Sequence, residues 1–129
     1  MPQPNNVPTI SAQAAFERLA SSSGDGPGES GGVLLVDVRE PWEFANTRAE
    51  GAVLLPVSTF GLRHGELPRD RSILVICQSG VRSGQVTAFL LGNGWTDVMN
   101  VAGGTLAWAA AGLPVRHGPP EPGEGDLPG

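Results

Sequence analysis

The chain alternates short apolar runs with segments in which apolar residues recur at helical spacing. Four of the runs are four to six residues long: 33–38, 52–55, 72–77 and 98–101. This length and composition are typical of strands that are buried on both faces of a parallel sheet. Strands that alternate with helices of similar length predict an α/β domain with a doubly wound parallel sheet.

The helical segments carry recognisable start and stop signals. Ser11 is suited to cap a helix that ends at Ala20, and Pro41 suits the first turn of a helix that runs through Phe44. Gly92 follows a third amphipathic segment in the manner of a helix C-cap. The remaining helices are predicted at 82–92 and 105–110, with a mixed turn and short helix at 58–67 that Gly61 and Gly65 interrupt.

The 19 glycines and 12 prolines exceed average usage, and most of the excess lies in three segments. These segments are poor in apolar residues and cannot bury enough surface to order themselves. We therefore expect a flexible N-terminus over 1–9, a flexible acidic loop over 21–32 and a disordered C-terminal tail over 117–129. The predicted folded part is a single domain over 10–116.

The charge balance excludes several classes of function. A net charge of −5 argues against a nucleic-acid partner. All eight basic residues are arginine, which excludes a lysine nucleophile, a Schiff base and a P-loop lysine. His64 and His117 have no ligand spacing to each other or to the cysteine, so no metal site is predicted.

The sequence also predicts where the protein resides. No apolar run approaches the length of a membrane-spanning helix, and the first residues lack the basic and apolar regions of a secretory signal. A single unpaired cysteine suits a reducing compartment. We expect a cytoplasmic monomer with no membrane partner.

Cys77, the only cysteine, closes the apolar run 72–77 and precedes the predicted helix 82–92. Backbone N–H groups converge at a helix N-terminus, where the helix dipole is positive. This setting favours the thiolate, which is the reactive form of cysteine. Free cysteines are also common as inert, buried apolar residues. The position of Cys77 alone leaves both interpretations open.

Polar residues follow two of the predicted strands directly. Asp37 and Arg39 come at the end of the run 33–38, and the loop 77–83 follows the next long run. Ligands of open α/β sheets bind beyond the carboxyl ends of the strands, so we expect these groups to share one site. A glycine at position 80 allows a tight turn, and successive N–H groups in such a loop form an anion-binding nest.

Four motifs in this order resemble those of the rhodanese-homology domain. Residues 34–44, Leu-Leu-Val-Asp-Val-Arg-Glu-Pro-Trp-Glu-Phe, are similar to its strand-and-turn signature. Residues 77–83, Cys-Gln-Ser-Gly-Val-Arg-Ser, resemble its active-site loop, and residues 103–108, Gly-Gly-Thr-Leu-Ala-Trp, its C-terminal signature. Gly51-Ala52 with Pro56 is similar to the motif before its third strand.

The resemblance implies a single-domain sulfurtransferase with a five-stranded parallel sheet and no metal or organic cofactor. The Cys77 thiolate would take a sulfur atom from thiosulfate or from a persulfide or polysulfide, hold it as a persulfide, and pass it to a thiol or cyanide. An alternative is a low-turnover binding or sulfur-relay module that acts with a protein acceptor. The implied substrate-binding residues are Gln78, Ser79, Gly80, Val81, Arg82 and Ser83, with Asp37 and Arg39 as supporting residues.

The loop length separates this family from phosphatases of the same fold, whose loop is one residue longer and usually follows a histidine. Four residues lie between Cys77 and Arg82, which suits a single sulfur atom better than a phosphoryl group. Arg82 is expected either to contact the substrate or to pair with Asp37 and brace the loop.

Two residues depart from the sequence pattern of the rhodanese-homology domain. Gln78 stands where the family often has arginine, which should weaken the attraction of a thiosulfate dianion. Arg48 stands where histidine is common, and only a local structural change is expected from it.

Overall fold

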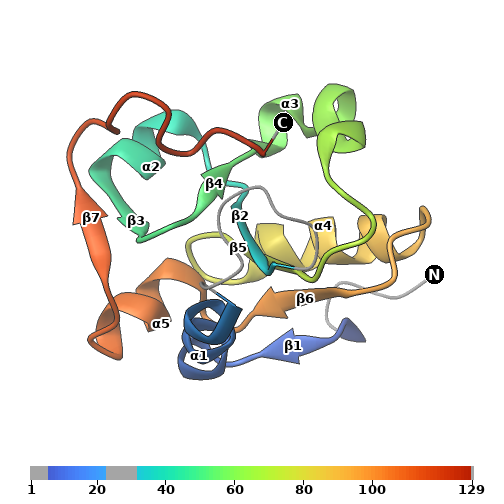
Figure 1. Ribbon diagram of the computed structural model, residues 1–129, viewed down its shortest axis with the longest axis horizontal. Helices are drawn as coiled ribbons and strands as arrows, with labels where there is room; N and C mark the ends of the chain where they lie inside the picture. The colour runs from blue at the N-terminus through green and yellow to red at the C-terminus, as the bar shows by residue number, and fades with distance from the viewer. Residues whose placement is uncertain (1–5, 23–31, 129) are drawn as a thin grey trace.

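The computed structural model describes residues 6–22 and 32–128, with a parallel five-stranded sheet at its centre (Figure 1). This sheet confirms the predicted fold class. Its strand order is β1-β6-β5-β2-β4, and every neighbouring pair is parallel. The strands are β1 (Thr9–Ile10), β2 (Leu34–Asp37), β4 (Val53–Leu54), β5 (Ile73–Ile76) and β6 (Val98–Val101).

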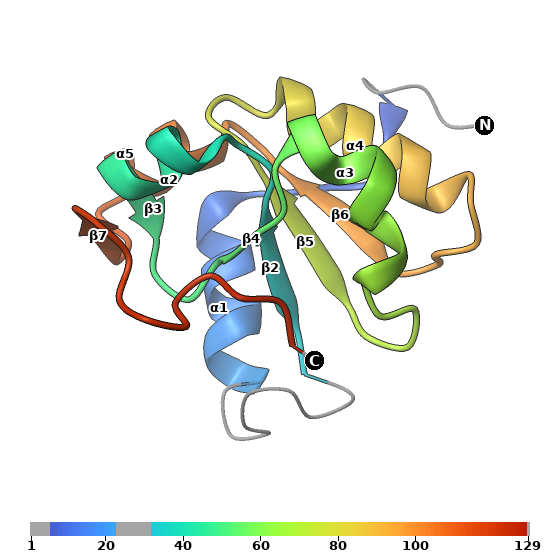
Figure 2. The same cartoon turned by 90° about the horizontal axis from the view of Figure 1, so that it is seen from above.

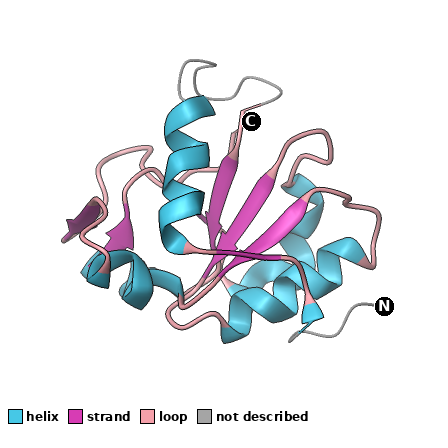
Figure 3. Ribbon diagram, turned by 90° about the horizontal axis from the view of Figure 1, so that it is seen from below, coloured by secondary structure: helices cyan, strands magenta, loops and turns pink. Residues whose placement is uncertain are grey.

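Helices cover both faces of the sheet. Figure 2 shows α3 and α4 on one face, and Figures 2 and 3 show α1 across the other face. None of the helices described is long and apolar enough to cross a membrane. The helices are α1 (Ala12–Ser22), α2 (Pro41–Asn46), α3 (Val57–Arg63) with the 3₁₀ turn η3 (His64–Glu66), α4 (Val81–Leu91) and α5 (Gly104–Ala110).

The helix boundaries agree with several of the predicted signals. Ser11 caps α1, because its Oγ accepts a hydrogen bond from the backbone N–H of Ala14 at 3.1 Å. Pro41 is the first residue of α2. Gly61 differs from its predicted role: α3 continues through it, and packing of Phe60 against the sheet offsets the low helix propensity of glycine.

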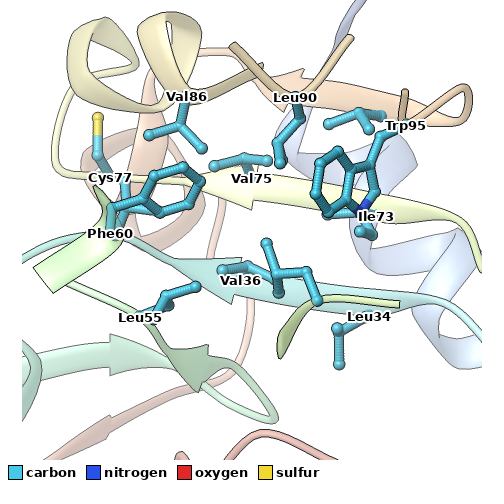
Figure 4. Close-up of a cluster of buried hydrophobic side chains, with 13 residues drawn as sticks. Leu34, Val36, Leu55, Phe60, Ile73, Val75, Cys77, Val86, Leu90 and Trp95 are labelled. Carbon is cyan, nitrogen blue, oxygen red and sulfur yellow. The ribbon is translucent and has the colours of Figure 1, made fainter. Parts of the chain in front are cut away.

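Successive side chains of β5 point to opposite faces of the sheet, so the core is divided into two clusters. Ile73 and Val75 point to the face covered by α3 and α4, where they meet Phe60, Val86 and Leu90 (Figure 4). Leu74 and Ile76 point to the opposite face and pack with Ala15 of α1, Phe44 of α2 and Trp108 of α5. Trp108 is therefore a packing residue, whereas Trp42 is 74% exposed.

The register of the strands places their carboxyl ends at one edge of the sheet. Asp37, the last residue of β2, pairs with Leu54 on one side and Ile76 on the other. Cys77 follows Ile76, so the two polar segments predicted to share a site do begin at the same edge. Helices α2, α3, α4 and α5 all start from this edge of the sheet.

The N-terminal segment is partly ordered, unlike the flexible 1–9 that the sequence predicted. Val7 is buried, and the carbonyl of Pro8 accepts a hydrogen bond from Asn100 N–H at 2.9 Å. β1 then extends the sheet as an edge strand beside β6. The two residues of this strand are too few to show a period in the sequence. Residues 1–5, and residues 23–31 of the predicted loop 21–32, lie outside the described residues.

The C-terminal segment also differs from the predicted disordered tail. β7 (Val115–His117) pairs antiparallel with β3 (Thr47–Ala49), and residues 118–128 then run back to the sheet. The carbonyl of Gly125 accepts a hydrogen bond from Leu54 N–H at 2.7 Å, and Leu127 packs against the core. The segment thereby satisfies a backbone donor of the edge strand β4.

Arg48 on β3 anchors this segment. Its side chain is almost fully buried and donates to the carbonyls of Phe44 and Gly118 and to both carboxylate oxygens of Glu124. The hydrogen bonds from Arg48 hold the pKa of Glu124 below its usual value. The arginine that replaces the family's histidine therefore binds the C-terminal segment to the domain.

Replacing Glu124 by alanine should destabilise the protein by about 1 to 3 kcal/mol, because the buried Arg48 guanidinium then loses its carboxylate partner. Urea denaturation followed by circular dichroism measures the change. Glu121→Ala is the control, since Glu121 is exposed and contacts Glu124 only through its backbone N–H and carbonyl, which alanine keeps. Equal unfolding midpoints for the two variants would contradict an anchoring role.

Candidate active site

Cys77 lies at the junction of β5 and α4, with its side chain at the end of the core cluster beneath α4 (Figure 4). The loop turns at Gly80, whose φ of +103° is in the left-handed region that glycine adopts without strain. This turn brings the N–H of Gly80 to within 3.1 Å of Sγ. The hydroxyl of Ser83, in the first turn of α4, lies 3.2 Å from Sγ on the buried side.

The N-terminus of α5 fixes the outer side of the loop. The backbone N–H and hydroxyl of Thr105 donate to the carbonyl of Cys77 at 2.8 and 3.1 Å. The N–H of Leu106 donates to the carbonyl of Gln78 at 3.1 Å. Because both carbonyls are held away from the sulfur, the N–H groups that follow can face it.

Glycine is required at the start of α5. Gly104 has a φ of +59°, and a Cβ there would overlap the carbonyl oxygens of Cys77 and Gln78. A Cβ on Gly103 would meet the Cβ of Ala107 at 2.6 Å. Gly104 is therefore what allows α5 to approach the cysteine loop so closely, and Gly103 avoids a clash with Ala107 within α5.

The hydrogen bonds to the sulfur favour its ionised form. Burial of Cys77 opposes ionisation, but the Ser83 hydroxyl and the N–H groups of Ser83, Gly80 and Ser79 together lower the pKa of the thiol below its usual value. These are neutral dipoles directed at the sulfur. The hydrogen bonds around Cys77 therefore favour the thiolate, which is the reactive form of cysteine.

Arg82 is paired with Glu43 of α2 and not with Asp37. Two parallel hydrogen bonds of 2.8 and 2.9 Å join its guanidinium to the carboxylate. These bonds lower the pKa of Glu43 to about 2 and raise that of Arg82. Of the two expected roles of Arg82, bracing the loop is the one that this geometry provides, with Glu43 as the partner that sequence reasoning did not assign.

Asp37 and Arg39 form a second pair beneath the site. The Arg39 guanidinium donates to both carboxylate oxygens of Asp37 at 2.8 to 3.1 Å and to the carbonyl of Thr47 at 2.6 Å. Asp37 also accepts from the backbone N–H of Arg39 at 2.9 Å. Both side chains are buried, so the pair holds the turn between β2 and α2 in shape.

The remaining loop side chains point outward. Gln78 and Ser79 are exposed, and Val81 is 65% exposed, so these three offer the site their backbone rather than their side chains. Among the residues that the structure describes, no three His, Cys, Asp or Glu side chains gather as metal ligands would.

Asn100 of β6 is a site residue that sequence reasoning missed. Its Nδ2 donates to the carbonyl of Gly80 at 3.1 Å, and its Oδ1 accepts a hydrogen bond of 2.6 Å from the Ser83 hydroxyl. The sequence did contain a signal for it: Asn100 is a polar residue inside an apolar strand, close to the carboxyl end where ligands bind.

The order of these motifs and the cysteine loop agree with one known family. Residues 25–111 match the family model of the rhodanese-like domain. The chain belongs to the rhodanese-like domain family. A crystal structure of a rhodanese-related protein from Thermoplasma volcanium superposes with a TM-score of 0.72 at 28% identity, covering 84% of this chain and 97% of that one.

Relatives of this rhodanese-like chain support general sulfurtransferase activity. A sulfurtransferase from Allochromatium vinosum is 38% identical over 109 residues, which cover 84% of this chain and 94% of that protein. The thiosulfate sulfurtransferase GlpE of Actinobacillus succinogenes is 35% identical over 83 residues, which cover 64% of this chain and 75% of that protein.

Replacing Ser83 by alanine should raise the pKa of Cys77 by about 1 to 2, because the thiolate loses a hydrogen-bond donor that the thiol does not need. The pH dependence of Cys77 alkylation by iodoacetamide measures this pKa. Ser79→Ala is the matched control on the same loop, since it keeps the backbone N–H that faces the sulfur. An unchanged pKa in Ser83→Ala would contradict the role of the hydroxyl.

Proposed function

We propose that this chain transfers a sulfane sulfur through a persulfide on Cys77. The observation that carries the proposal is the set of donors around Sγ, namely the Gly80 N–H at 3.1 Å and the Ser83 hydroxyl at 3.2 Å. These donors favour a thiolate, which is the nucleophile that sulfur transfer requires. The relatives that carry the name sulfurtransferase support the same reaction class.

The transfer has two steps. The Cys77 thiolate attacks the outer sulfur of the donor and forms an S–S bond, while the donor's own bond to that sulfur breaks. Thiosulfate then leaves as sulfite with the bonding electron pair, and a polysulfide leaves as a chain shortened by one sulfur. An acceptor thiolate or cyanide next attacks the outer sulfur of the persulfide, and Cys77 departs as a thiolate.

The charges near the loop favour a persulfide or polysulfide donor over thiosulfate. The guanidinium of Arg82 is occupied by Glu43, and that of Arg39 by Asp37. Gln78, directly after the cysteine, is neutral. Each arginine–carboxylate pair has no net charge, so neither attracts the sulfonate group of a thiosulfate dianion strongly.

Sulfur release needs an acceptor from outside the chain. A protein with a second cysteine can release its sulfur by forming an internal disulfide, but Cys77 is the only cysteine here. The acceptor is therefore a small thiol, cyanide or a thiol on another protein.

Incubation with a polysulfide should add the mass of one sulfur atom to the intact protein, and thiosulfate should do so more slowly. Intact-protein mass spectrometry over time measures both rates. Cys77→Ser is the control, since its hydroxyl cannot form a persulfide. Absence of the added mass in the wild-type protein, or equal gain by Cys77→Ser, would refute the proposed function.

A second candidate is a relay module that passes sulfur to a partner protein. Exposed apolar side chains lie in the first turns of four helices that start at the site's edge of the sheet. They are Trp42 of α2, Val57 of α3, Val81 of α4 and Leu106 of α5, which are 41 to 74% exposed. Exposed apolar residues around a reactive group are typical of a protein-docking surface.

The relay role predicts that Trp42→Ser slows transfer to a protein thiol about three- to tenfold and leaves transfer to free cysteine unchanged. The acceptors are reduced thioredoxin and free cysteine, and loss of the sulfur from persulfidated protein is followed by mass spectrometry. Leu62→Ser is the control, because Leu62 is 93% exposed but lies near the far end of α3. Equal effects of both variants on both acceptors would exclude a docking role for Trp42.

A further inference from the structure

The Ser83 hydroxyl has one proton and two acceptors within reach. Sγ of Cys77 lies 3.2 Å from its oxygen, and Oδ1 of Asn100 lies 2.6 Å away. Ser83 is fully buried and Asn100 is 8% exposed, so bulk water does not replace either partner readily. Because a hydroxyl donates one hydrogen bond at a time, the two acceptors compete for it.

The orientation of the Asn100 amide is fixed by its other partner. Nδ2 donates to the carbonyl of Gly80 at 3.1 Å. If the amide were flipped, Oδ1 would face that carbonyl and two acceptors would meet. Oδ1 must therefore face Ser83, where it can only accept.

We propose that Asn100 is a positioning residue that holds the Ser83 proton whenever Cys77 does not carry a negative charge. With the neutral thiol, S–H donates to the Ser83 oxygen and the hydroxyl donates to Asn100. When a solvent base removes the thiol proton, the hydroxyl turns toward Sγ and leaves Oδ1 without that donor. Asn100 thus favours the thiol over the thiolate, and acts only through Ser83.

The persulfide state follows the same logic and rests on the proposed function. The negative charge of a persulfide resides on its outer sulfur, so the inner Sγ becomes a weak acceptor. The hydroxyl then returns to Asn100. Ser83 therefore donates to Sγ mainly when Cys77 is a thiolate, which is its form before attack and after sulfur release.

The charged groups near Cys77 do not create this effect. Arg82 of α4 is paired with Glu43 of α2, and Asp37 of β2 with Arg39. The side chains on β6 and α5 that form hydrogen bonds with the loop are those of the uncharged Asn100 and Thr105. A substitution at Asn100 by an apolar residue changes the competition for the proton and leaves both ion pairs in place.

Asn100→Leu should lower the pKa of Cys77 by about 0.5 to 1, because the hydroxyl is then free to donate to the thiolate without competition. The measurement is the pH dependence of alkylation by iodoacetamide, which needs no sulfur donor. In a Ser83→Ala background, Asn100→Leu should have no further effect. Because the alkylation measurement is independent of sulfur transfer, a protein that takes up no sulfur would refute the proposed function and leave this inference standing.

Two results would overturn the inference. A raised pKa in Asn100→Leu would mean that Asn100 serves only to hold the Gly80 carbonyl, which also accepts from Gly84 N–H at 3.1 Å. A lowered pKa that persists in the Ser83→Ala background would mean that Asn100 does not act through the hydroxyl. Asn100→Asp keeps an acceptor for the hydroxyl and should raise the pKa of Cys77, whereas Asn100→Leu should lower it. If Asn100→Leu does not fold, Asn100→Ala takes its place.

Discussion

The site depends on the way the N-terminus of α5 binds the carbonyls of the cysteine loop. Thr105 and Leu106 hold the carbonyls of Cys77 and Gln78 outward, so the peptide N–H groups that follow can face Sγ. Buried Trp108, whose indole N–H donates to the carbonyl of Pro114 at 2.7 Å, anchors α5 in the core. The C-terminal motif therefore has a physical reason: Gly104 allows close approach to the loop, Thr105 binds the loop, and Trp108 fixes the helix.

The thiolate is stabilised by neutral dipoles rather than by a nearby free cation. Arg82 and Arg39 are each satisfied by a carboxylate, and their contribution is to hold α4, α2 and the β2–α2 turn in place. Fixed backbone dipoles in a buried loop are screened by salt much less than exposed charges are. In the proposed transfer, such a site accommodates negative charge on Sγ of the thiolate and on the outer sulfur of the persulfide, because no single ion pair must form or break as the charge moves.

Sequence reasoning succeeded where the signal is local and failed where it depends on distant partners. Apolar runs and the residue after them were enough to place β2, β5, β6 and Cys77. Nothing near Arg82 indicates Glu43 as its partner, because the two lie 39 residues apart and meet only when α2 and α4 start from the same edge. The C-terminal segment was missed for the same reason, since it is held by the distant, buried Arg48 and by only one apolar residue of its own, Leu127, which packs against the core.

Sulfur transfer places opposite demands on one thiol, and the Ser83 hydroxyl can meet both. A strongly stabilised thiolate leaves readily from a persulfide but attacks a donor less readily, because nucleophilicity falls as the pKa falls. A permanent cation beside Sγ would favour one step at the expense of the other. A hydroxyl that alternates between Sγ and Asn100 strengthens the donor set as the thiolate departs and relaxes it once sulfur is bound. Competition for one proton thus limits the stabilisation of the thiolate without removing it.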